Sequence, residues 1–359
     1  MSLPAVLLAS LVLLSLALEG CGEPTASRPE ITGRHGVYVL CEGLWGQNNA
    51  TLARIELPEG RIIPDVLAGT GMQLGDVGND MRLRGDTLYV VVSGSRSIEC
   101  FRASTAEWLG RIRLSENLYP RQLCIVNDTL GLVTDLYGDA VTAVHLQRFQ
   151  ELPVRYPVGP APEGIAAFGD YVFVANSGYG DYRAAEPKAG TVSVLSLQRG
   201  TEIATLPAGP NVVTVVLHPW RQYLYAVYLH LPSLWQADSL GGVVEYELPS
   251  LQRRRSWRLP VGSYDVAWSS RADTLLLLGN GGIWGIATTA QEAVPQLVWR
   301  NPQPQFDAWY TIAVDGSGDI WIGNARSFTV AGEVLRLRPG VGILQRFPVG
   351  LNPGALLFF

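Results

Sequence analysis

Charged side chains are scarce in this 359-residue sequence: Asp, Glu, Lys and Arg together make up 16% of it, and Lys188 is its single lysine. The formal net charge of −5 is mildly acidic. Such a chain has no general positive field that would attract nucleic acid. The run Arg253-Arg254-Arg255 is local, and its position between two expected strands predicts a solvated hairpin edge. We therefore expect no nucleic-acid partner.

Cysteine and histidine are also sparse, with four residues of each. No CxxC pair or His-rich spacing indicates a metal or redox site. The GxSxG elbow, the GxxxxGK[ST] loop and the HExxH helix are missing from the sequence. Tight turns between strands explain the acidic segment 315–319 and the glycine cluster 279–282 better than a calcium site or a phosphate loop does. We expect no catalytic residue, no metal and no cofactor.

Long amphipathic patterns are absent as well, since no stretch keeps an apolar 3.6-residue period over three turns. The 39 glycines and 23 prolines are more than a helical protein of this length tolerates. Short apolar runs bounded by turn residues are typical of strands. With 47% hydrophobic residues the chain can bury a substantial core. The expected fold class is all-β.

The first twenty residues have the composition of an export signal. No residue from 3 to 18 is charged, and this run is short for a bilayer span of about 20 residues but suits a signal peptide. Leu18-Glu19-Gly20-Cys21 then resembles a bacterial lipobox, although no Lys or Arg precedes the apolar run and Glu19 is unusual at its position. We predict a signal peptide at 1–20, lipidation of Cys21, a polar tether over 21–33 and one domain over 34–359. An ordinary signal with an incidental cysteine is the alternative.

One landmark strand recurs along the mature chain at a blade-sized interval. Its equivalent positions are Tyr38, Tyr89, Gly131, Phe173, Tyr225, Leu276 and Trp321. The intervals of 51, 42, 42, 52, 51 and 45 residues are those of β-propeller repeats. Each unit has an apolar strand, a polar turn, the landmark strand, a variable loop and two more strands.

The two ends of the domain complement each other. The first landmark strand, residues 36–41, lacks the inner strand that precedes the landmark in the other units, and residues 353–359 form such a strand with nothing after it. Placing this tail in the first blade closes a seven-bladed β-propeller and leaves no open sheet edge between the first and last blades. If Cys21 carries lipid, Cys41, Cys100 and Cys124 remain, and three cysteines cannot all pair internally.

Sequence resemblance agrees with this fold. Val-Gly-x-x-Pro elements at 158–162 and 349–353, together with GTVSVLSLQRG at 190–200, resemble the YVTN-type β-propeller repeat. The opening segment 37–57, which contains YVLCEGLWGQNNATLARIEL, is similar to the start of surface lipoprotein propellers. Some members of that group capture cobalamin at the outer membrane and pass it to a transporter. The resemblance implies a ligand and a partner of that kind, but it supplies no ligand motif.

The loops supply the candidate site. In a four-stranded blade the connection between the second and third strands and the connection to the next blade emerge on one face. The second-to-third connections are long at 42–49, 176–189, 229–242 and 324–332. Candidate ligand-binding residues in them are Trp45, Asn48, Asn49, Tyr179, Asp181, Tyr182, Trp235 and Phe328; candidates around the channel mouth are Asp80, Tyr119, Asn211, Tyr264, Asp265 and Trp309. Loop aromatics favour a binding surface, and shielding of the blades is the alternative.

We therefore expect an exported, non-enzymatic ligand-binding lipoprotein, anchored by lipid to the bacterial outer membrane on its periplasmic or surface face. Its ligand would be medium-sized, such as a corrinoid, and its partner an outer-membrane transporter. A protein-interaction scaffold at the envelope is the first alternative. A propeller enzyme, such as a lactone hydrolase or a quinoprotein-related dehydrogenase component, is the second, because a fold does not determine a function.

Overall fold

The computed structural model describes residues 35–231, 233, 240–279 and 281–359. The expected signal peptide and tether, the lipidation site Cys21 and the loop residue Trp235 lie outside the described residues. Tyr264 lies on a described strand, but its side chain is outside the description. Within the described part no helix is long and apolar enough to cross a membrane.

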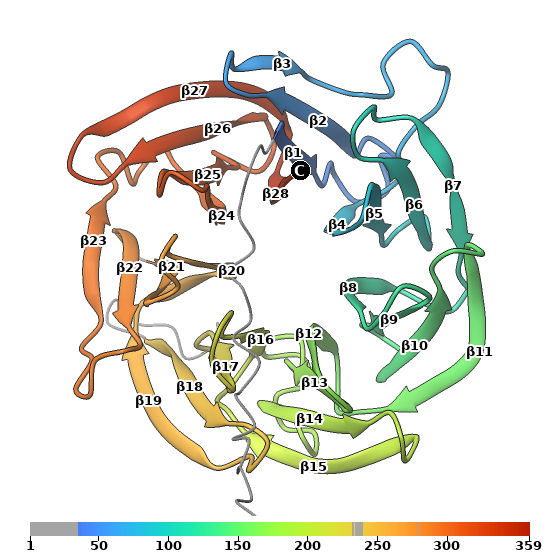
Figure 1. Cartoon of the computed structure of the whole chain (residues 1–359), viewed down its shortest axis with the longest axis vertical. Helices are drawn as coiled ribbons and strands as arrows, with labels where there is room; N and C mark the ends of the chain where they lie inside the picture. The colour runs from blue at the N-terminus through green and yellow to red at the C-terminus, as the bar shows by residue number, and fades with distance from the viewer. Residues whose placement is uncertain (1–34, 232, 234–239, 280) are drawn as a thin grey trace, which may run out of the picture. The chain divides into compact units, whose positions relative to one another are not determined.

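The described residues form seven four-stranded antiparallel sheets, which follow one another around a ring (Figure 1). From the inner strand outward, the first is β28 (Pro353–Phe358), β1 (Gly36–Cys41), β2 (Thr51–Glu56) and β3 (Arg61–Ile63). The second is β4 (Gly78–Arg84), β5 (Thr87–Val92), β6 (Ser97–Arg102) and β7 (Trp108–Arg113). The third is β8 (Pro120–Ile125), β9 (Leu130–Asp135), β10 (Ala140–His145) and β11 (Gln150–Pro157). The fourth is β12 (Pro162–Phe168), β13 (Tyr171–Asn176), β14 (Thr191–Ser196) and β15 (Thr201–Pro207).

The fifth sheet is β16 (Val212–Leu217), β17 (Tyr223–Tyr228), β18 (Gly241–Glu247) and β19 (Arg253–Leu259). The sixth is β20 (Val261–Trp268), β21 (Thr274–Gly279), β22 (Gly282–Ala287) and β23 (Gln296–Arg300). The seventh is β24 (Trp309–Val314), β25 (Ile320–Asn324), β26 (Ala331–Arg338) and β27 (Gly342–Leu351). The predicted all-β, seven-bladed propeller is confirmed.

The C-terminal strand closes the ring as predicted. β28 pairs antiparallel with β1, and its register places Leu357 opposite Tyr38 and Ala355 opposite Leu40. Each inner strand contacts the next one, and β28 contacts both β24 and β4. The first blade is thus assembled from the two ends of the domain, and this joins the first and last blades of the ring.

The core lies between neighbouring blades. The landmark strands are buried on both faces, as in β5, where Leu88 to Val92 are all buried, and this explains their unbroken apolar runs. The landmark glycine Gly131 stands where most blades have a large side chain. A Cβ there would lie 2.8 Å from a methyl group of Leu146 and 3.0 Å from one of Val144, so the space is already filled.

The acidic segment forms a turn, as predicted, and the cysteines of the propeller are unpaired. The segment Asp315 to Asp319 forms the turn between β24 and β25, where the Asp315 carboxylate accepts hydrogen bonds from the backbone N–H groups of Ser317 (2.9 Å) and Asp319 (3.0 Å). The three cysteines of the propeller, Cys41, Cys100 and Cys124, are buried free thiols.

The interpretation of the arginine run as a solvated hairpin edge was wrong for one of its members. Arg253 begins β19, and Arg255 lies opposite Glu245 of β18 in the strand register. The Arg255 guanidinium donates to the Glu245 carboxylate over 2.9 Å and 2.6 Å, and Glu245 has no exposed surface. A buried carboxylate requires a paired charge, which is why this arginine turns into the blade.

Candidate functional site

The antiparallel order of the strands places all second-to-third connections and all blade-to-blade connections on one face, which we call the loop face. The long connections lie where they were predicted, between β1 and β2, β13 and β14, β17 and β18, and β25 and β26. The hairpins between first and second strands emerge on the opposite face.

Five aromatic side chains form a continuous series on the loop face, which we call the aromatic row: Trp45, Tyr119, Tyr137, Tyr179 and Tyr182. The distances between successive ring centroids are 6.3, 4.9, 6.1 and 5.4 Å. Trp45 is 61% exposed and Tyr182 85% exposed, so the row is a surface feature and not core. Predicted ligand-binding residues and one predicted mouth residue, Tyr119, are brought together in it.

Tyr137 was missed by the sequence analysis because it lies in a short connection, between β9 and β10, and only long connections were searched. Burial is the largest influence on its hydroxyl and raises the pKa; Tyr179 raises the pKa further and Arg121 lowers it. The hydroxyl therefore lies within electrostatic reach of both groups. An aromatic residue directly after a landmark strand was the available signal.

Polar contacts fix the base of the row. The Tyr119 ring lies 4.9 Å from the Arg96 guanidinium carbon, and Arg96 also donates to the Tyr119 hydroxyl over 2.9 Å. The loop that carries Trp45 is tied down by the Gly46 N–H, which donates to the Asp76 carboxylate over 3.0 Å. The row is therefore held in place before any ligand arrives, which lowers the entropy that binding must overcome.

Several predicted polar contact residues are used within the loops. The side-chain oxygen of Asn49 accepts a hydrogen bond from Leu44 N–H (2.8 Å), and that of Asn211 accepts one from Gly180 N–H (3.3 Å). Asn48 donates to the Gln73 side chain, and Asp181 accepts from Ser233 N–H over 2.7 Å. Their first role is to shape the loops that present the rings.

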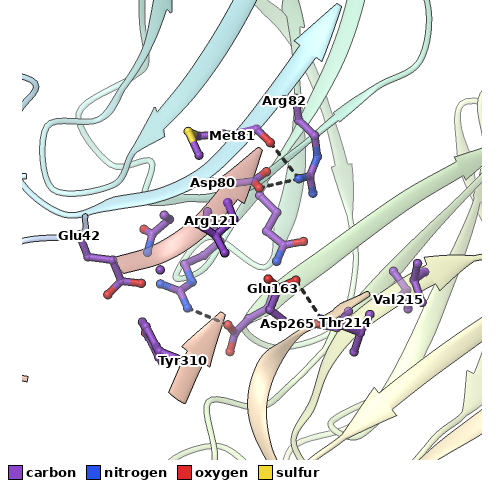
Figure 2. Close-up of a pocket in the computed structure, with 17 residues that line it drawn as sticks. Glu42, Asp80, Met81, Arg82, Arg121, Glu163, Thr214, Val215, Asp265 and Tyr310 are labelled. Carbon is purple, nitrogen blue, oxygen red and sulfur yellow. Dashed lines mark hydrogen bonds and ion pairs between the residues drawn. The ribbon is translucent and has the colours of Figure 1, made fainter. Parts of the chain in front are cut away.

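A cavity of about 330 Å³ lies in the central channel near the loop face (Figure 2). Its charged lining consists of Glu42, Asp80, Arg82, Arg121, Glu163 and Asp265. Tyr310 also lines it, and the ring of the predicted residue Phe328 packs against Tyr310 at 5.5 Å. Phe328 therefore supports the cavity wall from the seventh blade and is not part of the aromatic row.

Irregular pairing at the inner strands delivers these side chains. The register of each inner strand against its neighbour shifts where the strand enters from the loop face, for example between Gly78 and Asp80 and between Pro120 and Leu123. Similar shifts surround Glu163, Asp265 and Tyr310. A bulge re-aims a side chain that regular alternation would direct elsewhere. Arg121, Glu163, Asp265 and Tyr310 therefore reach the cavity from bulges.

Asp80 and Asp265 connect neighbouring blades. Asp80 accepts from Leu123 N–H of the next inner strand over 2.8 Å and pairs with Arg82 over 2.7 Å. Asp265 accepts from Ile312 N–H over 3.2 Å. Burial raises the pKa of Asp80 to about 6 and also raises the pKa of Asp265. These predicted mouth residues thus hold the ring together as well as lining its channel.

Glu42 lies at the centre of the remaining charged group. Burial raises the pKa of Glu42 to about 7, and the Arg121 guanidinium and a hydrogen bond from Tyr310 oppose that shift. Arg121 pairs with Glu163 over 2.9 Å. A Cβ on Gly354 would lie 2.6 Å from Glu42 Oε1, so the glycine in β28 makes room for this carboxyl group. A titratable group that changes charge near neutral pH in a cavity is a mark of functional sites.

Trp309, the other predicted mouth residue, lies apart from this cavity. It lines a second cavity of about 210 Å³ together with Asp307 and Asn301. The predicted mouth residues therefore do not form one site: Asp80 and Asp265 line the central cavity and connect blades, whereas Trp309 lines a separate cavity.

No protein-family model and no curated protein matches the sequence. Solved structures do match. A quinoprotein alcohol dehydrogenase-like protein from Bacteroides thetaiotaomicron has a TM-score of 0.68 at 14% identity, over 90% of this chain and 78% of that one. Hydrazine synthase of Kuenenia stuttgartiensis has a TM-score of 0.58 at 17% identity, over 75% of this chain and 85% of that one. Virginiamycin B lyase from Staphylococcus aureus has a TM-score of 0.56 at 12% identity, over 77% of this chain and 85% of that one.

At these identities the likeness shows the fold alone. The neighbours are in agreement with a β-propeller, and two of them are enzymes by name. The resemblance to the YVTN-type repeat and to the cobalamin-capturing lipoproteins stays a prediction.

Proposed function

We propose that this propeller is a ligand-binding lipoprotein of the bacterial cell envelope and that the aromatic row is its contact surface. The row itself carries the proposal, because five rings from four different connections form one series on one face. Exposed rings in contact with one another offer apolar area at little cost in side-chain entropy. Their hydroxyl and indole groups supply the polar contacts that orient a ligand.

A medium-sized conjugated molecule matches this surface best. The rings of Tyr179 and Tyr182 are close to parallel, with an interplanar angle of 29°, and those of Trp45 and Tyr119 are inclined by 20°. A flat ligand can lie along either pair. A corrinoid is the first candidate, on the strength of the resemblance at 37–57, and an outer-membrane transporter is then the partner that receives it.

Titration of the purified full-length protein with cyanocobalamin tests the proposal. Binding should quench part of the tryptophan fluorescence after correction for the absorption of the ligand. The double variant Trp45→Ala, Tyr179→Ala should bind more weakly by on the order of 2 kcal/mol or more, because large aromatic anchors dominate binding energies. Trp220→Ala is the matched control, since Trp220 is 48% exposed on the hairpin between β16 and β17, on the opposite face. A double variant with native affinity would exclude the row, and the absence of saturation would exclude cobalamin.

The same exposed surface supports a protein-interaction scaffold as a second candidate. Contiguous exposed aromatic surface is typical of protein contacts as well as ligand sites. Cross-linking in cells separates the two: a scaffold should be captured with its partner through residues of the row whether or not a small ligand is supplied.

The anchor carries a separate prediction. Changing Cys21→Ala should move the protein from the membrane pellet to the soluble fraction, because the thioether-linked lipid is the expected attachment. Fractionation followed by immunoblotting measures this, with Trp220→Ala as a variant that should stay in the pellet. A Cys21→Ala protein that resists a salt wash of the membranes would show that something other than this lipid retains it.

A further inference from the structure

The central cavity contains more negative than positive groups. Four carboxyl groups line it, those of Glu42, Asp80, Glu163 and Asp265, against the two guanidinium groups of Arg82 and Arg121. The other polar lining residues, such as Asn79, Gln122, Thr214 and Tyr310, are uncharged at neutral pH. With every carboxyl group ionised, the cavity holds two more negative than positive charges.

The two guanidinium groups form ion pairs with only two of the four carboxyl groups. Asp80 pairs with Arg82 at 2.7 Å, and Glu163 pairs with Arg121 at 2.9 Å. Asp265 accepts hydrogen bonds from Thr311 and Ile312 of β24, the inner strand of the next blade, and so connects two blades. Glu42 shares the field of Arg121 with Glu163 and accepts from Tyr310. Glu42 faces the cavity without a guanidinium of its own, and its carboxyl group is held by the hydrogen bond from Tyr310 of the neighbouring seventh blade.

Burying such a carboxylate is costly unless a positive charge or a proton accompanies it. The position of Glu42 is nevertheless built into the fold, since Gly354 leaves the space that its carboxyl group fills. A purely structural site would be cheaper with an amide at this position. An anionic ligand would face four carboxyl groups, whereas a cationic ligand would balance them.

The aromatic row also suits a cation. Arg121, which lines the cavity, lies within electrostatic reach of the Tyr137 hydroxyl in the aromatic row. The row already carries one guanidinium on a ring face, that of Arg96 on Tyr119. Ring faces attract ammonium and guanidinium groups. The rings of the loop face and the carboxyl groups of the cavity therefore both favour an organic cation over an anion.

We propose that the central cavity is a binding site for an organic cation, and that the ammonium or guanidinium group of the ligand lies beside Glu42. This site goes beyond the ligand proposed for the aromatic row and does not depend on the identity of that ligand. A positive group beside Glu42 favours its ionised form, and because burial raises the pKa of this carboxyl group to about 7, binding near neutral pH should release a proton.

Benzamidinium is a suitable probe, because its amidinium group stays charged across the range of interest and its ring can contact the mouth. Its neutral counterpart benzamide has nearly the same shape. Calorimetry on the full-length protein should show saturable binding of benzamidinium at about pH 8.5 and at least about tenfold weaker binding of benzamide. Lowering the pH to about 5.5 should weaken the binding of benzamidinium by about tenfold or more. Below pH 7 the ionised fraction of Glu42 falls about tenfold for each pH unit.

Glu42→Gln isolates the responsible group. This variant should bind benzamidinium about tenfold or more weakly at high pH. The affinity should also lose the part of its pH dependence that is centred near pH 7. The groups around Glu42 that also affect titration are Arg121, Glu163 and Tyr310, with Asp80, Arg82 and Asp265 farther along the channel. Asp128→Asn is the matched control: it removes one exposed carboxylate between β8 and β9, on the opposite face, and should leave binding unchanged.

Gly354→Ala provides an independent variant that keeps the carboxyl group but displaces it. It should weaken benzamidinium while leaving cyanocobalamin binding on the row intact. Equal affinities for benzamidinium and benzamide, or native affinity in Glu42→Gln, would overturn the proposal. Because the row and the cavity are tested with different probes and different variants, failure of one proposal is distinguishable from failure of the other.

Discussion

Deletion of residues 354–359 should leave a chain that aggregates or does not fold. The deleted strand β28 is the inner strand of the first blade and contacts the blades on both sides of it, through β24 and β4. The Phe358 ring meets Trp321 of the seventh blade at 5.6 Å, and the Phe359 ring lies 4.6 Å from that of Tyr38. Without β28 the inner edge of β1 and the two neighbouring blades are exposed together.

The magnitude follows from the side chains removed. Leu356, Leu357, Phe358 and Phe359 are large; Phe358 is buried and the other three are partly buried. Full burial of one large apolar side chain contributes about 1.5–3 kcal/mol, so the four together contribute roughly 4–8 kcal/mol. Their sum is comparable with the whole free energy of unfolding of an ordinary domain, about 5–15 kcal/mol. The exposed edge of β1 adds a template for intermolecular pairing.

Thermal unfolding and size-exclusion chromatography measure the result. Since the truncated chain is expected in aggregates, Phe358→Ala supplies a graded measurement and should lower the free energy of unfolding by about 3–5 kcal/mol. Val341→Ala is its control, because Val341 is an exposed apolar residue in the turn between β26 and β27. A truncated protein that melts within about a degree or two of the full chain would show that β28 does not close the ring.

The sequence was sufficient to predict the propeller because the landmark strands recur at a blade-sized interval, turn residues separate the strands within each interval, and the C-terminal tail supplies the strand that the first blade lacks. The opening strand lacks an inner neighbour and the closing strand lacks an outer one, and one pairing satisfies both. The exposed rings of the candidate site were also predictable where they lie on long loops, as with Trp45 and Tyr182.

The central cavity could not be predicted in the same way. Glu42, Arg121, Glu163 and Tyr310 come from four different blades, and no spacing in the sequence brings them together. Alternation along a strand tells which side chains face the channel only while pairing is regular. The register shifts at the start of the inner strands break that rule at Arg121, Glu163 and Tyr310. The direction of a side chain at a bulge depends on how the strand pairs with its neighbour, and the local sequence does not determine that pairing.

The arginine run shows the same limit for charges. The sequence predicts that all three arginines are solvated. Strand pairing instead places Arg255 opposite Glu245 and leaves Arg253 and Arg254 exposed. The second blade repeats this arrangement, with buried Glu99 of β6 opposite Arg111 of β7. A buried glutamate on the third strand and an arginine on the fourth are therefore a recurring device in this propeller.

In the fifth blade this device also joins two blades. The Arg255 guanidinium donates to the backbone oxygens of Thr288 and Ala290 in the sixth blade, each over 2.7 Å. Glu245 accepts from the Tyr225 hydroxyl over 2.7 Å. One carboxylate thus fixes a buried phenol and orients the arginine that connects the sheets.

Changing Glu245→Ala should destabilise the protein by about 3–5 kcal/mol, the usual consequence of removing one partner from a buried ion pair. The Tyr225 hydroxyl loses its acceptor and the Arg255 guanidinium loses its counter-charge, at a site where Glu245 has no exposed surface. Chemical denaturation measures the loss, and Glu247→Ala, at an exposed position two residues along the same strand, should change stability by less than about 0.5 kcal/mol. The double variant Glu245→Ala, Arg255→Ala should be less destabilised than the sum of the single variants, because neither charge is then left unpaired. Additive losses would mean that the two side chains stabilise the blade independently and that the pairing in the strand register is incidental.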